Sequence, residues 1–174
     1  MAEEGNVISN LRLDSGETGN GADTAPAAGI ISQYIKDLSV ENPNAPESFS
    51  WTDAPVLDVQ FNIAARPIGT TAELHEIELK VTATAKGESG TAYIVDLAYG
   101  ALIGMRNLDE ANMHAFLFAE APRLVFPFAR RVVVDAVRDA GYPPLVLEPI
   151  DFNGLYLQQL QQQAQAAGEP AGHA

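Results

Sequence analysis

The sequence has 174 residues, of which 47% are hydrophobic, and its 23 acidic against 10 basic side chains give a formal net charge of -13. A chain of this length can form one compact domain with its own core, but it is too short for two domains that each bury a sizeable core. The negative charge repels phosphate backbones and anionic membrane surfaces and attracts basic partners, so nucleic-acid binding is disfavoured. The lack of cysteine excludes disulfides, thiol catalysis and cysteine-bound metals.

The two ends of the chain differ from its middle in composition. Residues 1–29 include "DSGETGNGADTAPAAG", which has few large side chains to bury, and they predict a flexible acidic extension. Residues 164–174, "AQAAGEPAGHA", have too little apolar content to be held down and predict a second flexible tail. A single folded domain is therefore expected over residues 30–163.

The first residues of the sequence do not follow the pattern of a secretion signal. "MAEEGNVISN" is acidic and lacks a basic stretch followed by an apolar one, and no apolar run in the sequence reaches membrane-spanning length. We therefore expect a cytoplasmic protein with no direct membrane insertion.

The first predicted strand, "IISQYIKDLSV", has two mixed faces. Strict alternation places one set of side chains on one face: Tyr34, Lys36, Leu38 and Val40. It places a second set on the other face: Ile35, Asp37, Ser39 and Glu41. Because neither face is clearly apolar, this segment is expected to be an edge strand.

Two further segments, "VLDVQFNIAA" and "HEIELKVTATA", alternate cleanly between apolar and polar residues and predict half-buried strands. The turn "KGESG" then leads into a fourth strand, "TAYIVDLAYGALIG", so that the third and fourth strands form a long hairpin.

Both faces of the fourth strand are apolar. Tyr93, Val95, Leu97 and Tyr99 point one way, whereas Ala92, Ile94, Asp96 and Ala98 point the other way. An apolar second face on a lone domain predicts that another subunit or a ligand covers it.

Helical patterns follow the strands. A capping-box-like start at Asn107 opens the segment "NLDEANMHAFLFAEAP", which Pro122 ends or bends. A second helix should run to Gly141 with a kink near Pro127, and Asp151 should cap a short third helix. Strands followed by helices predict an α+β fold, with an antiparallel four-stranded sheet that carries its helices on one face.

No catalytic constellation is evident. Ser89 lies in a turn between strands, where a nucleophile elbow requires a helix. His75 and His114 have no nameable third partner, and the alternation of Glu76 and Glu78 fits a solvated sheet face. We therefore expect neither an enzyme nor a protein with a metal or cofactor.

The aromatic residues are unevenly distributed. Phe49 and Trp51 follow the proline-bearing segment "VENPNAP", Tyr142 follows the second helix, and Phe152 and Tyr156 lie on the third. Aromatic side chains dominate core packing, so all five could be core residues. Alternatively, they could line a groove that holds apolar side chains of an extended polypeptide.

Two long segments resemble the SecB family of bacterial protein-export chaperones. These are "YIKDLSVENPNAP", followed by Phe49 and Trp51, and the stretch from "APRLVFPFARRVVVDAVRDAG" through "YPPLVLEPIDFNGLYLQQLQQQ". The resemblance spans Ile30–Gln163. It implies a four-stranded antiparallel sheet with helices on one face and a homotetramer built as a dimer of dimers. It also implies an ATP-independent holdase that binds unfolded secretory precursor proteins and delivers them to the SecA translocation ATPase.

The resemblance also implies roles for individual residues. The residues matched to SecA binding are Asp37, Glu41, Ile94 and Asp96. Those matched to subunit association are Val95, Leu97 and Tyr99. Those matched to a client peptide-binding groove are Phe49, Trp51, Tyr142, Phe152 and Tyr156.

Two other functions are compatible with the sequence. A related holdase could serve another client, such as a toxin–antitoxin system, with the motor contacts unused. More distantly, the chain could be a small-ligand-binding α+β protein. The chain departs from familiar SecB members in its long N-terminal extension, its lack of cysteine and its less acidic C-terminal tail.

Overall fold

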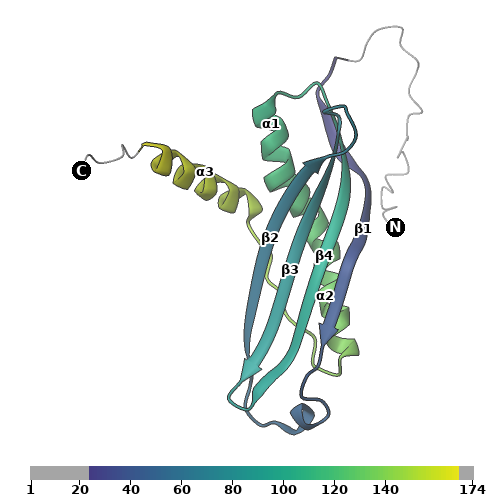
Figure 1. Ribbon diagram of the computed structural model, residues 1–174, viewed down its shortest axis with the longest axis vertical. Helices are drawn as coiled ribbons and strands as arrows, with labels where there is room; N and C mark the ends of the chain where they lie inside the picture. Colours follow the sequence, from purple (N-terminus) through teal and green to yellow (C-terminus); the bar gives the residue numbers. More distant parts are fainter. Residues whose placement is uncertain (1–23, 169–174) are drawn as a thin grey trace, which may run out of the picture.

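The computed structural model describes residues 24–168 of the chain (Figure 1). Four long strands form one antiparallel sheet: β1 (Ala27–Glu41), β2 (Val56–Pro67), β3 (Leu74–Gly87) and β4 (Gly90–Arg106). Their order across the sheet is β1-β4-β3-β2. This order confirms the predicted antiparallel sheet and the predicted edge position of the first strand, and β3 and β4 form the expected hairpin.

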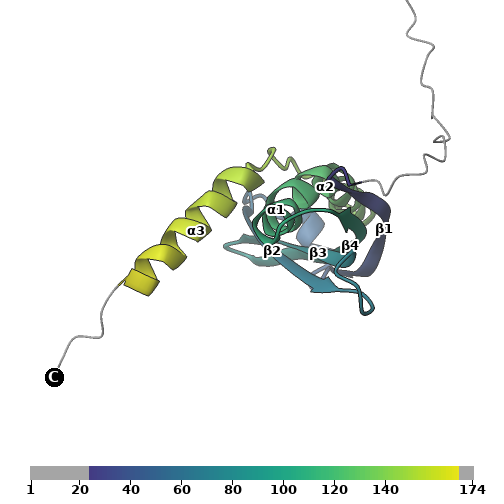
Figure 2. The same ribbon diagram turned by 90° about the horizontal axis from the view of Figure 1, so that it is seen from above.

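The helices follow the strands. They are α1 (Glu110–Ala115), the π-helical segment η2 (Phe116–Glu120), α2 (Ala121–Asp139) and α3 (Phe152–Gly168), and a short 3-10 helix, η1 (Glu47–Ser50), lies between β1 and β2. Helices α1 and α2 lie over one face of the sheet, whereas α3 projects away beside β2 (Figures 1 and 2). The predicted sheet with helices on one face is therefore confirmed, and α3 contacts the core through Phe152 in its first turn.

Several predicted element ends also differ. The first helix begins at Glu110, and its N-cap is Asp109, whose carboxylate accepts a 2.7 Å hydrogen bond from the Asn112 amide. A π-helical turn just before Pro122 lets the helical run continue, and α2 also continues through Pro127. Wide π turns accommodate such local disruptions of the hydrogen-bond ladder.

Strand β1 and helix α3 both extend beyond the predicted domain limits of residues 30 and 163. β1 begins at Ala27, and α3 runs to Gly168, so the third helix is not short. Most of the predicted N-terminal extension, residues 1–23, and the end of the predicted C-terminal tail, residues 169–174, lie outside the described residues.

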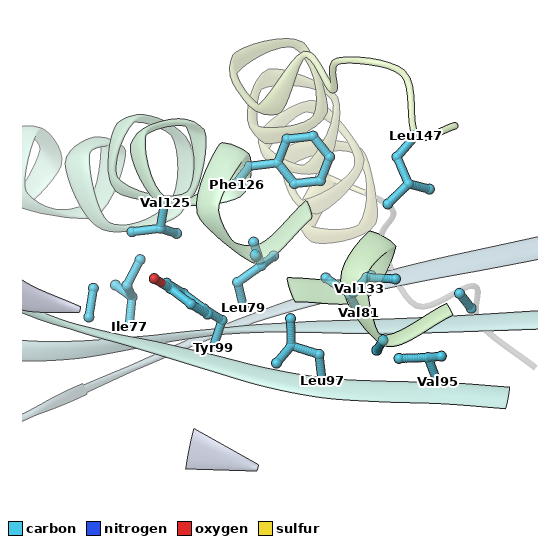
Figure 3. Packing of buried hydrophobic residues seen from close by; sticks show 14 of the residues in the cluster. Ile77, Leu79, Val81, Val95, Leu97, Tyr99, Val125, Phe126, Val133 and Leu147 are labelled. Atoms are coloured by element: carbon cyan, nitrogen blue, oxygen red, sulfur yellow. The ribbon is translucent and has the colours of Figure 1, made fainter. Parts of the chain in front are cut away.

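The core lies between the sheet and α2. We call the sheet face toward α2 the inner face and the opposite face the outer face. Side chains of α2 pack on the inner face of β3 and β4 (Figure 3), among them Val125, Phe126 and Val133. Their partners on the sheet include Ile77, Leu79, Val81, Val95, Leu97 and Tyr99. The clean alternation of the two central strands thus places their apolar side chains in one buried layer.

A β-bulge at Lys36 changes the predicted faces of β1. Ile35 pairs with Tyr99 of the inner face, yet Asp37 pairs with Ala98 of the outer face. An extra residue in a strand resets its alternation. Strict alternation had predicted that Tyr34 and Lys36 share a face with Leu38 and Val40, and that Ile35 shares a face with Asp37. Because of the bulge, both predictions were wrong.

Candidate functional site

The connection between β1 and β2, residues 42–55, is fixed at one end by Tyr142. We call this segment the crossover loop. The Tyr142 hydroxyl meets Ser48 Oγ at 2.7 Å and points toward Asn42 Oδ1 at 2.8 Å and the Ala92 carbonyl at 2.9 Å. The Asn42 side-chain amide donates to the Ala140 carbonyl at 2.9 Å. Three segments of the chain therefore meet at the Tyr142 hydroxyl: the residues after α2, the crossover loop and the start of β4.

The other end of the crossover loop is attached to the tip of the β3–β4 hairpin. The Asp53 carboxylate accepts hydrogen bonds from the Ser89 hydroxyl at 2.9 Å and the Ser89 amide at 3.3 Å, and these bonds lower the pKa of Asp53. The Asn44 side chain donates to the Thr91 carbonyl at 2.9 Å. Ser89 therefore anchors a loop, which agrees with its prediction as a turn residue.

Three of the five predicted groove aromatics surround one groove of about 600 Å³. Phe49, Trp51 and Tyr142 line it, together with residues of the sheet and of segment 141–146. The ring centroids of Phe49 and Tyr142 are 5.2 Å apart, and those of Tyr93 and Tyr142 are 4.9 Å apart. Phe49 is 51% exposed. The result is a row of aromatic rings held in place by the polar contacts of Tyr142.

Trp51 lies at the hairpin end of this groove. It is half-buried, and a Cβ atom added at Gly90 would lie 3.2 Å from its ring. Gly90 also has a φ of +141°, which favours glycine. Gly90 therefore both turns the hairpin and leaves room for the indole.

Phe152 and Tyr156, the other two predicted groove residues, lie at a second hollow. This hollow has a volume of about 220 Å³ and is also lined by Phe61 and Ile63 of β2. Phe152 is 2% exposed and packs edge-on against Phe126 at 5.5 Å, so it is a core residue. Tyr156 meets His114 Nδ1 through its hydroxyl at 2.9 Å. The predicted single set of aromatics is thus divided between two places.

Strand β2 connects the two hollows. Its inner-face residue Leu57 lines the larger groove, and Phe61 and Ile63 line the smaller one. Val59 lies between them, and all four side chains are partly buried against the core. A strip of apolar surface therefore runs along the inner face of this edge strand.

The four residues predicted to bind SecA come together on the outer face. Glu41 pairs with Ile94, and Ser39 pairs with Asp96, which places Asp37 one step further along the same face. Asp37, Glu41 and Asp96 are exposed, and Ile94 is half-buried. The Thr82 hydroxyl donates to the Asp96 carboxylate at 2.6 Å. We call Asp37, Glu41, Ile94 and Asp96 the acidic face.

The residues matched to subunit association occupy the protomer core. Val95, Leu97 and Tyr99 are 0%, 2% and 6% exposed beneath α2. These side chains therefore pack mainly within the protomer. Exposed apolar side chains occur instead on the inner face of β1, at Ile35, Leu38 and Val40.

The predicted apolar second face of β4 is partly covered by its own chain. Side chains of β1 cross the outer face beside Gly100 and reach β3, so part of this face is polar. Sequence reasoning missed this arrangement because the contacting residues are about 40 positions apart in the chain.

A network of charged residues on the outer face is the main feature that the sequence did not predict. Glu76 is only 4% exposed, although it was predicted on a solvated face. It accepts hydrogen bonds from the Tyr34 hydroxyl at 2.6 Å, Lys36 Nζ at 3.2 Å and Arg66 Nε at 2.6 Å. Lys36 also donates to Glu78 at 2.6 Å. We call Tyr34, Lys36, Arg66, Glu76 and Glu78 the cross-sheet network.

The cross-sheet network should make stability depend on pH. The hydrogen bond from Tyr34, followed by those from Lys36 and Arg66, lowers the pKa of Glu76 below its ordinary value of 4.5. A lowered carboxyl pKa stabilises the fold above pH 4.5, and this contribution is lost as the pH falls through the folded-state pKa.

We therefore expect Glu76→Gln to lower the free energy of unfolding at pH 7 by roughly 2 kcal/mol, as charge-assisted hydrogen bonds are lost. The deficit relative to the unmodified protein should shrink as the pH approaches 3. Urea unfolding of both proteins at fixed concentration across this range tests the prediction. A deficit that stays constant from pH 7 to pH 3 contradicts it.

Other kinds of site are limited by what the described residues contain. Between residues 24 and 168, no cluster of three or more His, Asp or Glu side chains could hold a metal ion. In the same part of the chain, no helix is both long and apolar enough to cross a membrane.

Comparison with known proteins identifies the family. The family model described as "Preprotein translocase subunit SecB" matches residues 21–163. Curated relatives named protein-export protein SecB include those of Novosphingobium aromaticivorans, 66% identical, and Erythrobacter litoralis, 53% identical, and each match covers 100% of both chains.

A solved structure also shares the fold. It is a SecB-like chaperone from Mycobacterium tuberculosis in complex with a peptide from the antitoxin HigA1, with a TM-score of 0.60 and 18% identity. The match covers 71% of this chain and 90% of that one. The structural match shows the fold, whereas the family model and the curated relatives show that the chain belongs to the SecB family of protein-export chaperones.

Proposed function

We propose that this protein is an ATP-independent holdase that binds non-native secretory precursors in the cytoplasm, keeps them translocation-competent and delivers them to SecA. The observation that carries the proposal is the aromatic groove of about 600 Å³ beside the crossover loop. Its walls are held by the hydrogen bonds of Tyr142 and Asp53, so it need not form anew when a client binds.

Client recognition would rest on apolar contacts distributed along one unfolded chain. The groove presents Phe49, which is 51% exposed, and Val146, which is 82% exposed. The apolar strip of β2 leads from this groove to the hollow at Phe152 and Tyr156. Several weak sites on one surface give high avidity with little sequence selectivity, which suits a holdase.

SecA would bind to the acidic face on the opposite side of the sheet. Three exposed carboxylates around Ile94 suit a basic segment of a partner, with an apolar contact at the centre. Client and motor would then occupy opposite faces of one sheet, so that both can be bound at once. The attraction should weaken as salt is added.

Replacing Trp51 with alanine should weaken the binding of an unfolded precursor by about tenfold, because truncating one aromatic anchor costs roughly 1 to 2 kcal/mol. The tetramer should remain intact, since Trp51 packs on its own hairpin at Gly90. Fluorescence anisotropy with a labelled precursor measures the affinity. Val56→Ala is a suitable control, because Val56 is 76% exposed outside the groove. Equal affinities for the two variants would place Trp51 among the structural residues.

We also propose that the protein assembles as a homotetramer, a dimer of dimers. β1 is an edge strand, and its inner face exposes Ile35, Leu38 and Val40 at 48%, 41% and 42%. Helix α3 exposes Leu155, Leu157 and Leu160. Open strand edges and clustered apolar side chains are typical of surfaces that associate.

Light scattering should therefore give a particle of four 18.6 kDa chains in dilute solution. Leu38→Lys should lower this mass, because it places a charge in the apolar surface of the edge strand. Ser32→Lys, at an exposed outer-face position of the same strand, is the matched control and should leave the mass unchanged. A monomer in the unmodified protein contradicts the proposed assembly.

A further inference from the structure

The bulge at Lys36 decides which side chains of β1 reach the outer face. With the bulge, Asp37, Ser39 and Glu41 pair with Ala98, Asp96 and Ile94 of that face. Without the extra residue, the alternation of β1 beyond Ile35 would be shifted by one position. Leu38 and Val40 would then point outward, and Asp37 and Glu41 would turn toward α2. The acidic face therefore exists only because Lys36 is the extra residue.

The cross-sheet network holds Lys36 in that position. β4 separates β1 from β3, and Gly100 leaves a gap in it: a Cβ atom there would lie 2.6 Å from the Tyr34 ring and 3.1 Å from the Lys36 chain. Through this gap Tyr34 and Lys36 reach Glu76 and Glu78 on β3. Arg66 reaches the same Glu76 carboxylate from β2, so the network ties the edge strand to the rest of the sheet.

The burial of Glu76 makes the network selective for this arrangement. Its carboxylate is 4% exposed and is satisfied by two cations and a hydroxyl group. Hydrogen bonds to a carboxylate are roughly twice as strong as those between neutral groups, so an arrangement that loses two of the three is disfavoured. Any slip of β1 that moves Tyr34 and Lys36 away from Gly100 would leave Glu76 with Arg66 alone.

We propose that the cross-sheet network is a positioning device for the acidic face, with Lys36 as its central residue. This inference rests on the proposed function, because it assigns the network to SecA binding. Lys36 does not itself contact the motor. It acts by fixing the register in which Asp37 and Glu41 stand beside Asp96 and Ile94.

The test uses two lysine-to-methionine variants that change the charge of the same face equally. Charge alone predicts that either variant binds a basic partner more tightly, because the face becomes more negative. Positioning predicts that Lys36→Met binds SecA about tenfold more weakly, despite the more negative face, as oriented charge contacts are lost. Lys80→Met, at a 60% exposed side chain, should bind as well as the unmodified protein or better.

Further variants separate positioning from general damage to the fold. Lys36→Arg keeps the cation and should restore binding to within about twofold. When Asp37→Asn and Glu41→Gln are already present, adding Lys36→Met should not weaken SecA binding further. The effects of substitutions that act through the same contacts do not add. Precursor affinity should be unchanged, because the aromatic groove lies on the inner face away from the cross-sheet network. If Lys36→Met does not fold, Tyr34→Phe replaces it in the test. Its binding to SecA should then be about threefold weaker than that of the unmodified protein, and unchanged binding would overturn the positioning inference.

The outcomes are distinct. If the unmodified tetramer does not bind SecA in a titration at low salt, the proposed function fails and the positioning inference fails with it. If the unmodified protein binds and Lys36→Met binds equally well or more tightly, the positioning inference alone is overturned. Weakened binding by Lys36→Met, with tight binding by Lys80→Met and Lys36→Arg, supports it.

Discussion

Reversing two charges of the acidic face, with Asp37→Lys and Glu41→Lys together, should weaken binding to SecA by about 100-fold. Each reversal replaces an attraction to a basic partner by repulsion, and close interfacial charge pairs are worth about 1.5 kcal/mol or more. Both carboxylates are exposed on β1 beside Asp96, so the substituted lysines need not be buried. Titration calorimetry with SecA at low salt measures the loss.

The control for this variant reverses two exposed acids away from the outer face, with Asp139→Lys and Glu148→Lys. It changes the net charge by the same amount but should bind SecA within about threefold of the unmodified protein, since long-range attraction is screened. Both double variants should still suppress aggregation of an unfolded precursor. Normal SecA binding by the Asp37 and Glu41 variant would show that the motor contacts another surface.

Replacing Phe152 with alanine should lower the free energy of unfolding by about 4 kcal/mol, as expected for a buried phenylalanine. Phe152 is 2% exposed and is fixed against Phe126 at the start of α3. The next polar anchor of that helix is the exposed contact between Tyr156 and His114. The loss should therefore also release α3 from the body of the protein.

Chemical denaturation at a fixed protein concentration measures this effect, because the stability of an assembly depends on concentration. Gln158→Ala is the matched control on the same helix, where the side chain is exposed. It should cost less than about 1 kcal/mol. A similarly small cost for Phe152→Ala would mean that Phe152 is a groove residue rather than part of the core.

The sheet was largely predictable because its central strands follow simple rules. The alternation around Leu79 and Leu97 gave the correct buried face, and the "KGESG" turn gave the correct hairpin. The edge strand was less predictable. A bulge adds one residue without changing the local composition, and the resulting change of face depends on Gly100, which lies far away in the sequence.

The ends of two helices were predicted incorrectly, one from the pattern of apolar residues and one from the choice of N-cap. Helix α3 continues to Gly168 because glutamine and alanine are good helix formers, although few of these side chains can be buried. Apolar content alone therefore ended the predicted helix too early. The first helix begins later than expected because Asp109, rather than Asn107, supplies the N-cap oxygen.

The candidate sites were predictable only in part. Phe49, Trp51 and Tyr142 were expected together and do line one groove. Phe152 was not separable from them by residue type, because a buried and an exposed phenylalanine look alike in a sequence. Glu76 was missed for a similar reason. Its burial comes from Tyr34, Lys36 and Arg66 on two other strands, and no local pattern contains these contacts.

The most direct test of the proposed holdase function is the aggregation of an unfolded secretory precursor, followed by light scattering, with nucleotide removed from the solution. The protein should suppress aggregation at about one tetramer per precursor, and adding ATP should change nothing. Aggregation that proceeds unchanged with tetramer in excess, or suppression that requires ATP, would contradict the proposed function.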